Sequence, residues 1–162
     1  MKLILIRHAK SGWDDPFADD HERTLTDRGN RAAAAIGAWL TAQGHLPTHI
    51  YCSDATRTQQ TAETIMAHLA PAPLLSLHPS LYHASPDTIA ALIQRKPQES
   101  LAIIGHNPGI AMLAHGLLLD RPDHRRFSDY PTCATTVIDI APALTPASGT
   151  CTDFVVPRDL TD

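Results

Sequence analysis

Short hydrophobic runs alternate with amphipathic segments along most of the chain. The runs at residues 2–6, 49–52 and 101–104 are typical of strands buried on both faces. A weaker run at residues 74–77 is a further strand candidate. Between the runs, hydrophobic residues recur three and four positions apart, as on one face of a helix. These positions are Ala32, Ile36, Trp39 and Leu40; Ala62, Ile65, Met66 and Leu69; Ile89, Leu92 and Ile93; and Ile110, Leu113 and Leu117.

Residues that cap helices mark the expected ends of these segments. Thr26 stands where the first helix needs an N-cap, and Gly44 is expected just past its end. Pro71 and Pro73 should stop the second helix. The other predicted starts are Ser53 or Asp54 for the second helix, and Ser85-Pro86 and Asn107-Pro108, as cap and first residue, for the third and fourth.

The last third of the chain has a different pattern. Residues 120–132 are polar and contain proline, which predicts a loop. Two β-rich stretches follow at 135–140 and 153–156 with no clear helix between them, so an antiparallel strand is expected near the C-terminus. The chain as a whole is therefore predicted to be a single α/β domain over residues 1–162. It should have a mostly parallel sheet with helices on both faces.

Composition and charge narrow the function classes. The 162 residues carry a formal net charge of −4, with 43% hydrophobic and 19% charged residues, which excludes an intrinsically disordered chain. The acidic balance argues against nucleic acid or an anionic membrane as a partner, so a bound anion must be held by a few local cations. Three cysteines without close spacing, and an N-terminal apolar run too short for a signal peptide, predict a cytoplasmic protein without a disulfide framework.

The candidate chemistry lies where the predicted strands end. Arg7-His8 follows the first run, Ser53–Arg57 the second, and Gly105–Pro108 the run at 101–104. Ligands of open α/β sheets bind beyond the carboxyl ends of the strands, and helix N-termini there attract anions. Any one such Arg or His is more often an inert surface residue. Together, two guanidinium groups and two imidazoles at three strand ends favour a site for a phosphate-like oxyanion.

These segments resemble the histidine phosphatase superfamily, also called phosphoglycerate-mutase-like. Leu5–Lys10 is similar to its Arg-His-Gly signature, with Ala9 where Gly is usual. The further similarities are Ser53–Glu63, Gly105–Gly109 and Arg23–Gly29. The short chain, together with Arg7–Trp13 and Tyr130–Ala134, most resembles the SixA-type phosphohistidine phosphatases. The resemblance covers most of residues 2–140 and implies a phosphoglycerate-mutase-like fold.

The resemblance also implies roles for individual residues. His8 would be the nucleophile and become phosphohistidine, which water then cleaves. Arg7 and Arg57 would clamp the phosphate oxygens, and His106 would donate to the same oxygens. Asn107, Lys10 and Ser11 are further candidates for contact with phosphate or substrate, although Lys10 and Ser11 could equally lie in a solvated loop. No metal and no cofactor is expected, because the guanidinium groups replace a metal as the charge sink.

The leaving group decides between substrates. Superfamily members that act on sugar phosphates place a Glu or Asp after the middle strand. In residues 79–87 the expected carboxylate is missing near Tyr82-His83, and Asp87 lies a few residues beyond. His83, or less readily Tyr82, could donate the proton, and His83 could equally be an inert loop histidine. The missing carboxylate favours a phosphohistidine, for example on a phosphotransfer protein. A small phosphomonoester and a non-catalytic phosphate-binding module remain alternatives. The basic cluster His124–Arg126 could contact an acidic partner or be a solvated face.

Overall fold

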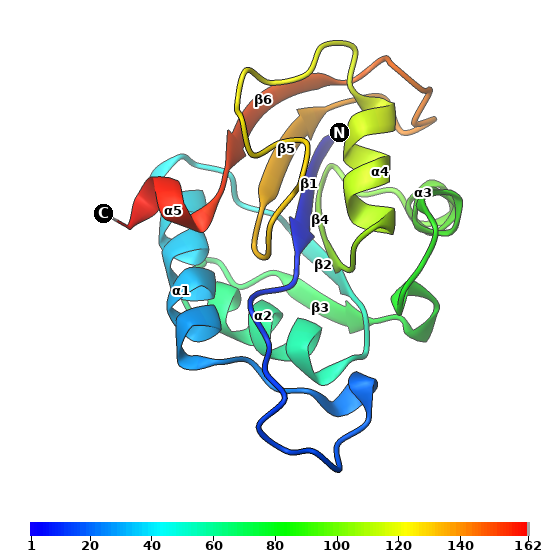
Figure 1. Cartoon of the computed structure of the whole chain (residues 1–162). Coiled ribbons are helices and arrows are strands. Elements are labelled where there is room, and N and C mark those ends of the chain that lie inside the picture. The colour runs from blue at the N-terminus through cyan, green and yellow to red at the C-terminus, as the bar shows by residue number, and fades with distance from the viewer. Residues whose placement is uncertain (162) are drawn as a thin grey trace.

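The computed structural model describes residues 1–161, which form a six-stranded mixed sheet with helices on both faces (Figure 1). The strand order is β3-β2-β4-β1-β5-β6. The first four strands are parallel, whereas β5 pairs antiparallel with β1 and with β6. The bounds are β1 Lys2–Arg7, β2 His49–Cys52, β3 Leu74–Leu77, β4 Ser100–Gly105, β5 Thr135–Asp139 and β6 Thr150–Val155.

The helices divide between the two faces of the sheet. Helices α1 and α2 pack together over one face, and α3 and α4 cover the other. The short helix α5 lies beside α1 near the C-terminus (Figure 1). The bounds are α1 Asp27–Ala42, α2 Thr56–Met66, α3 Pro86–Arg95, α4 Gly109–Leu117 and α5 Pro157–Leu160, with 3-10 turns η1 Asp20–Glu22 and η2 Pro79–Leu81. None of the described helices is both long and apolar enough to cross a lipid bilayer.

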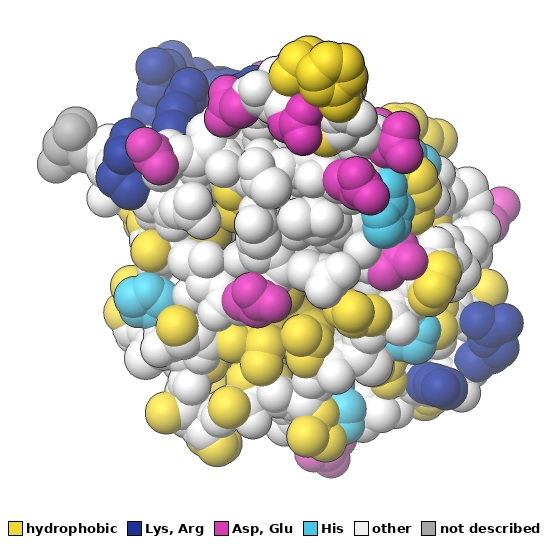
Figure 2. All heavy atoms as spheres, turned by 90° about the horizontal axis from the view of Figure 1, so that it is seen from below, with side chains coloured by type: hydrophobic (Ala, Val, Ile, Leu, Met, Phe, Trp, Pro, Cys, Tyr) yellow, Lys and Arg dark blue, Asp and Glu magenta, His cyan; other side chains and the backbone are white. Residues whose placement is uncertain are grey.

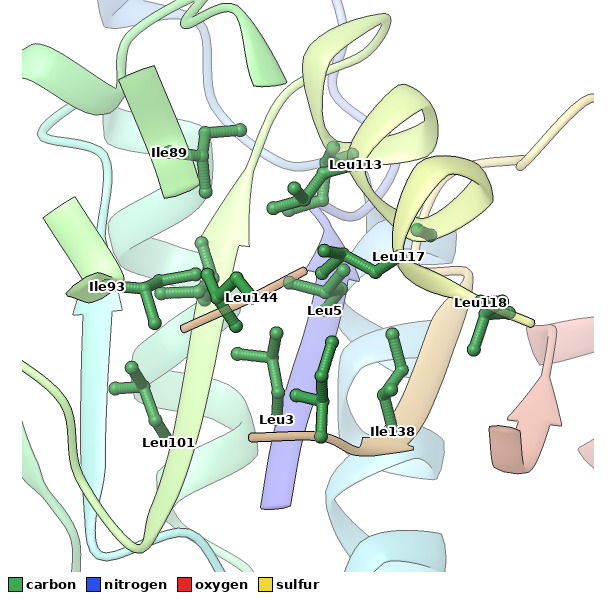
Figure 3. Packing of buried hydrophobic residues seen from close by; sticks show 14 of the residues in the cluster. Leu3, Leu5, Ile89, Ile93, Leu101, Leu113, Leu117, Leu118, Ile138 and Leu144 are labelled. Atoms are coloured by element: carbon green, nitrogen blue, oxygen red, sulfur yellow. The ribbon is translucent and has the colours of Figure 1, made fainter. Parts of the chain in front are cut away.

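The central strand β1 supplies both halves of the hydrophobic core. Its side chains alternate between faces, so Leu3 and Leu5 pack under α3 and α4, whereas Ile4 and Ile6 pack under α1 and α2. All four are completely buried. Figure 3 shows Leu3 and Leu5 beside Leu113 and other residues of the first cluster. This two-sided burial explains why the strand is a continuous apolar run in the sequence.

The fold class and the expected antiparallel pairing near the C-terminus are confirmed. Two of the predicted caps also hold: Thr26 Oγ1 accepts from Gly29 N at 3.0 Å, and Ser85 Oγ accepts from Thr88 N at 3.2 Å. Gly44 follows α1 with φ +72°, the left-handed conformation that suits glycine past a helix end.

Two predicted helix starts are wrong. Helix α2 begins at Thr56 after Ala55, and the Ser53 side chain bonds to His106 and to the backbone N–H of Ala55, which precedes the helix. Helix α4 begins at Gly109 after Pro108, because the Asn107 side chain donates to a distant carbonyl and caps nothing. Strand β6 also starts earlier than residue 153, since Thr150 already pairs with Asp139 of β5. Strand β3 exists, but all four of its residues are exposed at the sheet edge.

The register of the parallel strands aligns the carboxyl ends of β1, β2 and β4. Ile6 of β1 and Cys52 of β2 both pair with Ile104 of β4. The residues that follow each strand therefore emerge at the same edge of the sheet, side by side. This geometry assembles the candidate site from segments that are far apart in the sequence.

Candidate active site

A cavity of about 260 Å³ opens at the carboxyl edge of the parallel strands. It contains every residue that the sequence nominated for catalysis or binding except Tyr82. It also contains three residues outside that set, Trp13, Arg23 and Thr132. The full lining is Arg7, His8, Lys10, Ser11, Trp13, Arg23, Arg57, His83, His106, Asn107 and Thr132.

The imidazole of His8 is held in one tautomer. Its Nδ1 lies 2.7 Å from the carbonyl oxygen of Ala9, and a carbonyl can only accept, so Nδ1 carries the hydrogen. Nε2 is then the nitrogen with the free lone pair. The pKa of His8 is lowered to about 4, chiefly by burial and further by the positive charges of Arg57, Arg7 and Arg23, against the opposing effect of the Ala9 hydrogen bond. His8 is therefore an uncharged base at neutral pH.

Arg7 is tied to the loop before β5. Its Nη1 donates to the carbonyl oxygen of Tyr130 at 3.1 Å, and Asn107 Nδ2 donates to the same oxygen at 2.9 Å. The Tyr130 hydroxyl is itself buried and donates to Leu5 O at 3.0 Å, which fixes this loop to β1. Among the described residues, Arg7 Nε and Asn107 Oδ1 are buried without a hydrogen-bond partner.

Arg57 enters the cavity from the first turn of α2 and is almost completely buried. Its Nη1 donates to the carbonyl oxygen of Asp20 at 2.6 Å, and its Nη2 donates to Asp20 Oδ2 at 3.1 Å. Within residues 1–161, Arg57 Nε is a second buried guanidinium donor without a partner. Because an unpaired buried donor is costly, an oxyanion that accepts from the Nε groups of Arg7 and Arg57 would relieve that cost.

His106 follows β4, and both of its ring nitrogens form hydrogen bonds. Arg57 Nη2 donates toward Nδ1 at 3.3 Å, so Nδ1 accepts and the hydrogen lies on Nε2, which donates to Ser53 Oγ at 2.8 Å. Burial, together with His8 and Arg57, lowers the pKa of His106 to about 2. The expected N–H donation from His106 to phosphate is not available in this arrangement, where the ring instead steadies Arg57.

Asp20 contacts both of the residues that were nominated as proton donors. The Tyr82 hydroxyl donates to Asp20 Oδ2, and His83 Nε2 lies 3.0 Å from the same oxygen. The Tyr82 ring also faces the Arg57 guanidinium, 5.9 Å away, but does not line the cavity. His83 does line it, with its ring centroid 4.9 Å from that of His106. Of the two, His83 is the one that lines the cavity.

The outer wall of the cavity contains an aromatic ring, a hydroxyl and cations. Arg23 Nη1 donates to Ser11 Oγ at 2.8 Å, and the Arg23 guanidinium stacks 4.1 Å above the Trp13 ring. Ser11 is buried, whereas Lys10 is exposed at the mouth. The Arg23 guanidinium also pairs with Asp20 Oδ1 at 3.0 Å, so Asp20 connects the outer wall to Arg57.

Sequence reasoning missed Asp20 and Thr132, and did not assign Arg23 to the site. Residues 12–23 were predicted as a polar loop, and nothing in their pattern distinguishes Asp20 from Asp19. The resemblance at Arg23–Gly29 is the only signal that pointed to Arg23. The hydrogen bonds of Asp20 with Tyr82 and His83, and the charge of Arg57, lower the pKa of its carboxyl far below the ordinary range against the opposing effect of burial, so it stays an anion.

The cavity combines cations with uncharged imidazoles. Arg7, Arg23, Arg57 and Lys10 outnumber the one carboxylate, Asp20, that pairs with this group. Fixed cations beside a free imidazole lone pair suit a tetrahedral oxyanion that is to be attacked by that nitrogen. Within residues 1–161, no three His, Cys, Asp or Glu side chains gather as they would around a metal ion.

Comparison of the sequence with known families finds one match. Residues 3–81 match the model of the histidine phosphatase superfamily, branch 1. An uncharacterised protein of Mycobacterium tuberculosis is 33% identical over 163 residues, which cover 94% of this chain and 100% of that protein. An uncharacterised chloroplastic protein of Arabidopsis thaliana is 44% identical over 68 residues, and the match spans 42% of this chain and only 31% of that protein.

Comparison with solved structures finds the same fold over the full chain. The protein histidine phosphatase SixA complexed with tungstate superimposes with a TM-score of 0.83 at 21% identity, covering 99% of this chain and 100% of that one. A candidate phosphohistidine phosphatase SixA from Nakamurella multipartitia superimposes with a TM-score of 0.75 at 28% identity, covering 96% and 95%.

Proposed function

Since this chain belongs to branch 1 of the histidine phosphatase superfamily, we propose that it is a phosphohydrolase whose nucleophile is His8. One observation carries the proposal. The Nδ1–H of His8 is committed to Ala9 O, which leaves the Nε2 lone pair free in a cavity that the guanidinium groups of Arg7 and Arg57 also line. A neutral imidazole in this setting is a nucleophile at neutral pH, because burial and the neighbouring cations disfavour its protonation.

The reaction proceeds in two transfers. Nε2 of His8 attacks phosphorus in line, a P–Nε2 bond forms, and the bond from phosphorus to the leaving atom breaks. The leaving atom keeps the electron pair and takes up a proton. Water then attacks the phosphohistidine, the P–Nε2 bond breaks, and inorganic phosphate and neutral His8 are released. The Nδ1–H bond to Ala9 keeps the ring aligned through both transfers.

Arg7 and Arg57 supply the charge stabilisation. Both side chains line the cavity, where their guanidinium N–H groups can donate to non-bridging oxygens of the phosphoryl group. His106 and Asp20 act on Arg57 as positioning residues, because they bond its terminal nitrogens. Asn107 and Lys10, which also line the cavity, complete the phosphate contacts, and Ser11 orients Arg23. No metal is needed in this scheme.

The preferred substrate class is a phosphohistidine carried on a protein, for example on a phosphotransfer domain. The chain resembles proteins described as phosphohistidine phosphatases over nearly its full length. Tungstate, bound in one of them, is a tetrahedral oxyanion of the same shape as phosphate. A phosphoramidate also needs little help from an acid on the enzyme once its nitrogen is protonated, which fits the missing carboxylate after β3.

A small phosphomonoester is the second candidate, and His83 favours it. This imidazole lies at the cavity wall 3.0 Å from the Asp20 carboxylate. The pair can carry a proton to an alkoxide leaving group, which an ester requires. His83 in this role would replace the carboxylate that the sequence lacks.

The decisive variant is His8→Ala. We expect hydrolysis of para-nitrophenyl phosphate to fall by roughly a thousandfold or more and to survive EDTA in the unmodified protein. The unmodified protein should also form an acid-labile, alkali-stable phosphoenzyme that the variant lacks. His68→Ala, which removes an exposed histidine, is the matched control and should keep full activity. Activity that persists in His8→Ala would refute the nucleophile.

A substrate panel separates the remaining alternatives. A phosphohistidine-bearing phosphotransfer domain is compared with sugar phosphates by kcat/KM. Faster turnover of the sugar phosphates, with a loss in His83→Gln, would favour the ester. Tight binding of inorganic phosphate with no turnover of any substrate would identify a non-catalytic phosphate-binding module.

A further inference from the structure

A second cavity, of about 140 Å³, lies next to the catalytic one. The two share Lys10 and Thr132, so they adjoin one another. The second cavity has a strongly cationic lining: Lys10, Arg28, Arg126 and Arg158 stand around Ala32, Pro131, Thr132, Val156 and Pro157. We call it the cationic groove.

Helices α1 and α5 extend the cationic groove away from the catalytic pocket. A third cavity, of about 340 Å³, continues it and is lined in part by Arg28, Arg31 and Arg158. Arg28 and Arg31 are one helical turn apart on α1, which spaces their backbones by about 5 Å along the helix. Figure 2 shows a group of Lys and Arg side chains at one corner of the molecule, at its upper left. These cations therefore line a surface that begins at the catalytic cavity and continues along α1 and α5.

Most of this charge has no partner on the protein. Arg126 pairs with Asp129 at 3.0 Å. Within residues 1–161, no carboxylate lies within 4.0 Å of Lys10, Arg28, Arg31 or Arg158. Along the chain, Asp27 adjoins Arg28 and Asp159 adjoins Arg158. The Asp159 carboxylate is engaged elsewhere, since its Oδ2 pairs with His124 at 3.0 Å and accepts from Val156 N at 3.0 Å. In a protein of net charge −4, gathering uncompensated cations beside the pocket costs self-repulsion that an anionic ligand would relieve.

The loop between β1 and η1 has the opposite character. It contains Asp14, Asp15 and Asp19, together with Trp13 and Phe17, whose side chains are 65% and 93% exposed. Trp13 lines the catalytic cavity, so this acidic loop borders that cavity, whereas the residues contributed by α1 and α5 to the cationic groove are cationic. An anionic partner is therefore directed over the cationic groove. Large exposed aromatic side chains beside the mouth are typical of surfaces that contact another protein.

We propose that the cationic groove docks an acidic segment of the phosphoprotein whose phosphorylated side chain enters the catalytic cavity. This inference rests on the proposed phosphatase activity and specifies its substrate: a phosphohistidine with Asp or Glu residues beside it. The third cavity, which adjoins the cationic groove, shares no lining residue with the catalytic cavity, so a phosphate bound in the catalytic cavity leaves this cationic surface free for a longer ligand. Such contacts act mainly on encounter and orientation, so they should raise kcat/KM and weaken with added salt.

The test uses three synthetic peptides, each phosphorylated on one histidine and flanked by four Glu, four Ser or four Lys residues. We expect the unmodified protein to prefer the Glu peptide over the Ser peptide by roughly tenfold or more in kcat/KM at low salt. The preference should disappear in Arg28→Glu/Arg158→Glu, while kcat/KM for para-nitrophenyl phosphate stays the same. Arg95→Glu/Lys96→Glu makes the same change in net charge on exposed residues at the end of α3 and should keep the preference.

The outcomes separate the docking surface from the phosphatase. An unchanged Glu preference in Arg28→Glu/Arg158→Glu, or equal loss in Arg95→Glu/Lys96→Glu, would overturn the docking surface and leave the phosphatase standing. Inorganic pyrophosphate serves as a small polyanion that inhibits hydrolysis of para-nitrophenyl phosphate. If Arg28→Glu/Arg158→Glu weakens this inhibition by the same factor as it weakens the Glu preference, the groove binds small polyanions and the docking surface is overturned. No hydrolysis of para-nitrophenyl phosphate by the unmodified protein would overturn the phosphatase itself, and the docking proposal with it.

Discussion

Asp20 holds both terminal nitrogens of Arg57, one through its backbone carbonyl at 2.6 Å and the other through its carboxylate at 3.1 Å. The same carboxylate accepts from the Tyr82 hydroxyl and contacts His83. Asp20, the first residue of η1, therefore sets the position of Arg57 from α2 and of His83 from the turn before α3.

Asp20→Asn should impair turnover more than binding. The amide keeps the size of the side chain but loses its charge, so Arg57 and His83 are held less firmly. We expect kcat for para-nitrophenyl phosphate to fall roughly ten- to a hundredfold, as misplacement of a charge-stabilising group by about 1 Å would predict. Asp19→Asn removes an exposed neighbouring carboxylate and should change kcat little. A larger effect from Asp19→Asn would contradict the positioning role.

His8 should take up its proton far below the usual range for histidine. Burial lowers the pKa of His8 to about 4, so the ring should remain neutral throughout the range in which exposed imidazoles titrate. NMR titration of the protein with labelled histidine measures this directly, without interference from the ionisation of a substrate. A midpoint between pH 6 and 7 would contradict the buried, cation-flanked environment.

Arg57→Gln tests the electrostatic part of that pKa. Removing one of the neighbouring positive charges should raise the midpoint of His8, but by less than about one pH unit, because burial contributes more than Arg57 does. A midpoint that moves to that of a free histidine would show that the arginine, and not burial, dominates.

Stability should fall as the solution is made acidic. The folded pKa values of His8 and His106 are lowered to about 4 and about 2, so between pH 6 and 4 the unfolded chain binds protons that the folded chain does not. The free energy of unfolding should therefore decrease as pH falls through this window, by roughly 1.4 kcal/mol per pH unit for each histidine. Urea unfolding at pH 7, 6 and 5 measures the slope, and His106→Gln should make it shallower by about one such increment.

Gly109 should be intolerant of a side chain. A Cβ built there would lie 1.9 Å from the carbonyl oxygen of Ala84, so Gly109→Ala must displace either α4 or the segment that contains His83. We expect a loss of about 2 kcal/mol or more in unfolding free energy, together with lower kcat. Gly116, on the same helix, has nothing within 4 Å of the position that a Cβ would take, so Gly116→Ala should stabilise by roughly 0.5–1 kcal/mol. Equal effects of the two changes on thermal unfolding would contradict the close approach.

The hydrophobic pattern predicted β1, β2 and β4 and the helices between the strands, because burial on both faces leaves a direct mark on composition. Leu3 to Ile6 illustrate this: each is completely buried, and each is apolar in the sequence. The exposed edge strand β3 was predicted only as a weaker run. Caps were predicted where side-chain bonding is local, as at Thr26. They failed at Ser53 and Asn107, whose side chains bond to His106 and to the Tyr130 carbonyl, 53 and 23 residues away.

The sequence by itself determined the fold class and nominated His8, Arg7, Arg57 and His106, because these residues follow strands whose ends a parallel sheet must bring together. Only the tertiary structure decided which ring nitrogens are free, which cations are paired, and that Asp20 belongs to the site. It also placed α5 beside α1, which brings Arg158 to Arg28 and creates the cationic groove. Those properties depend on contacts between residues distant in the chain, and local patterns of hydrophobic and polar residues do not encode them.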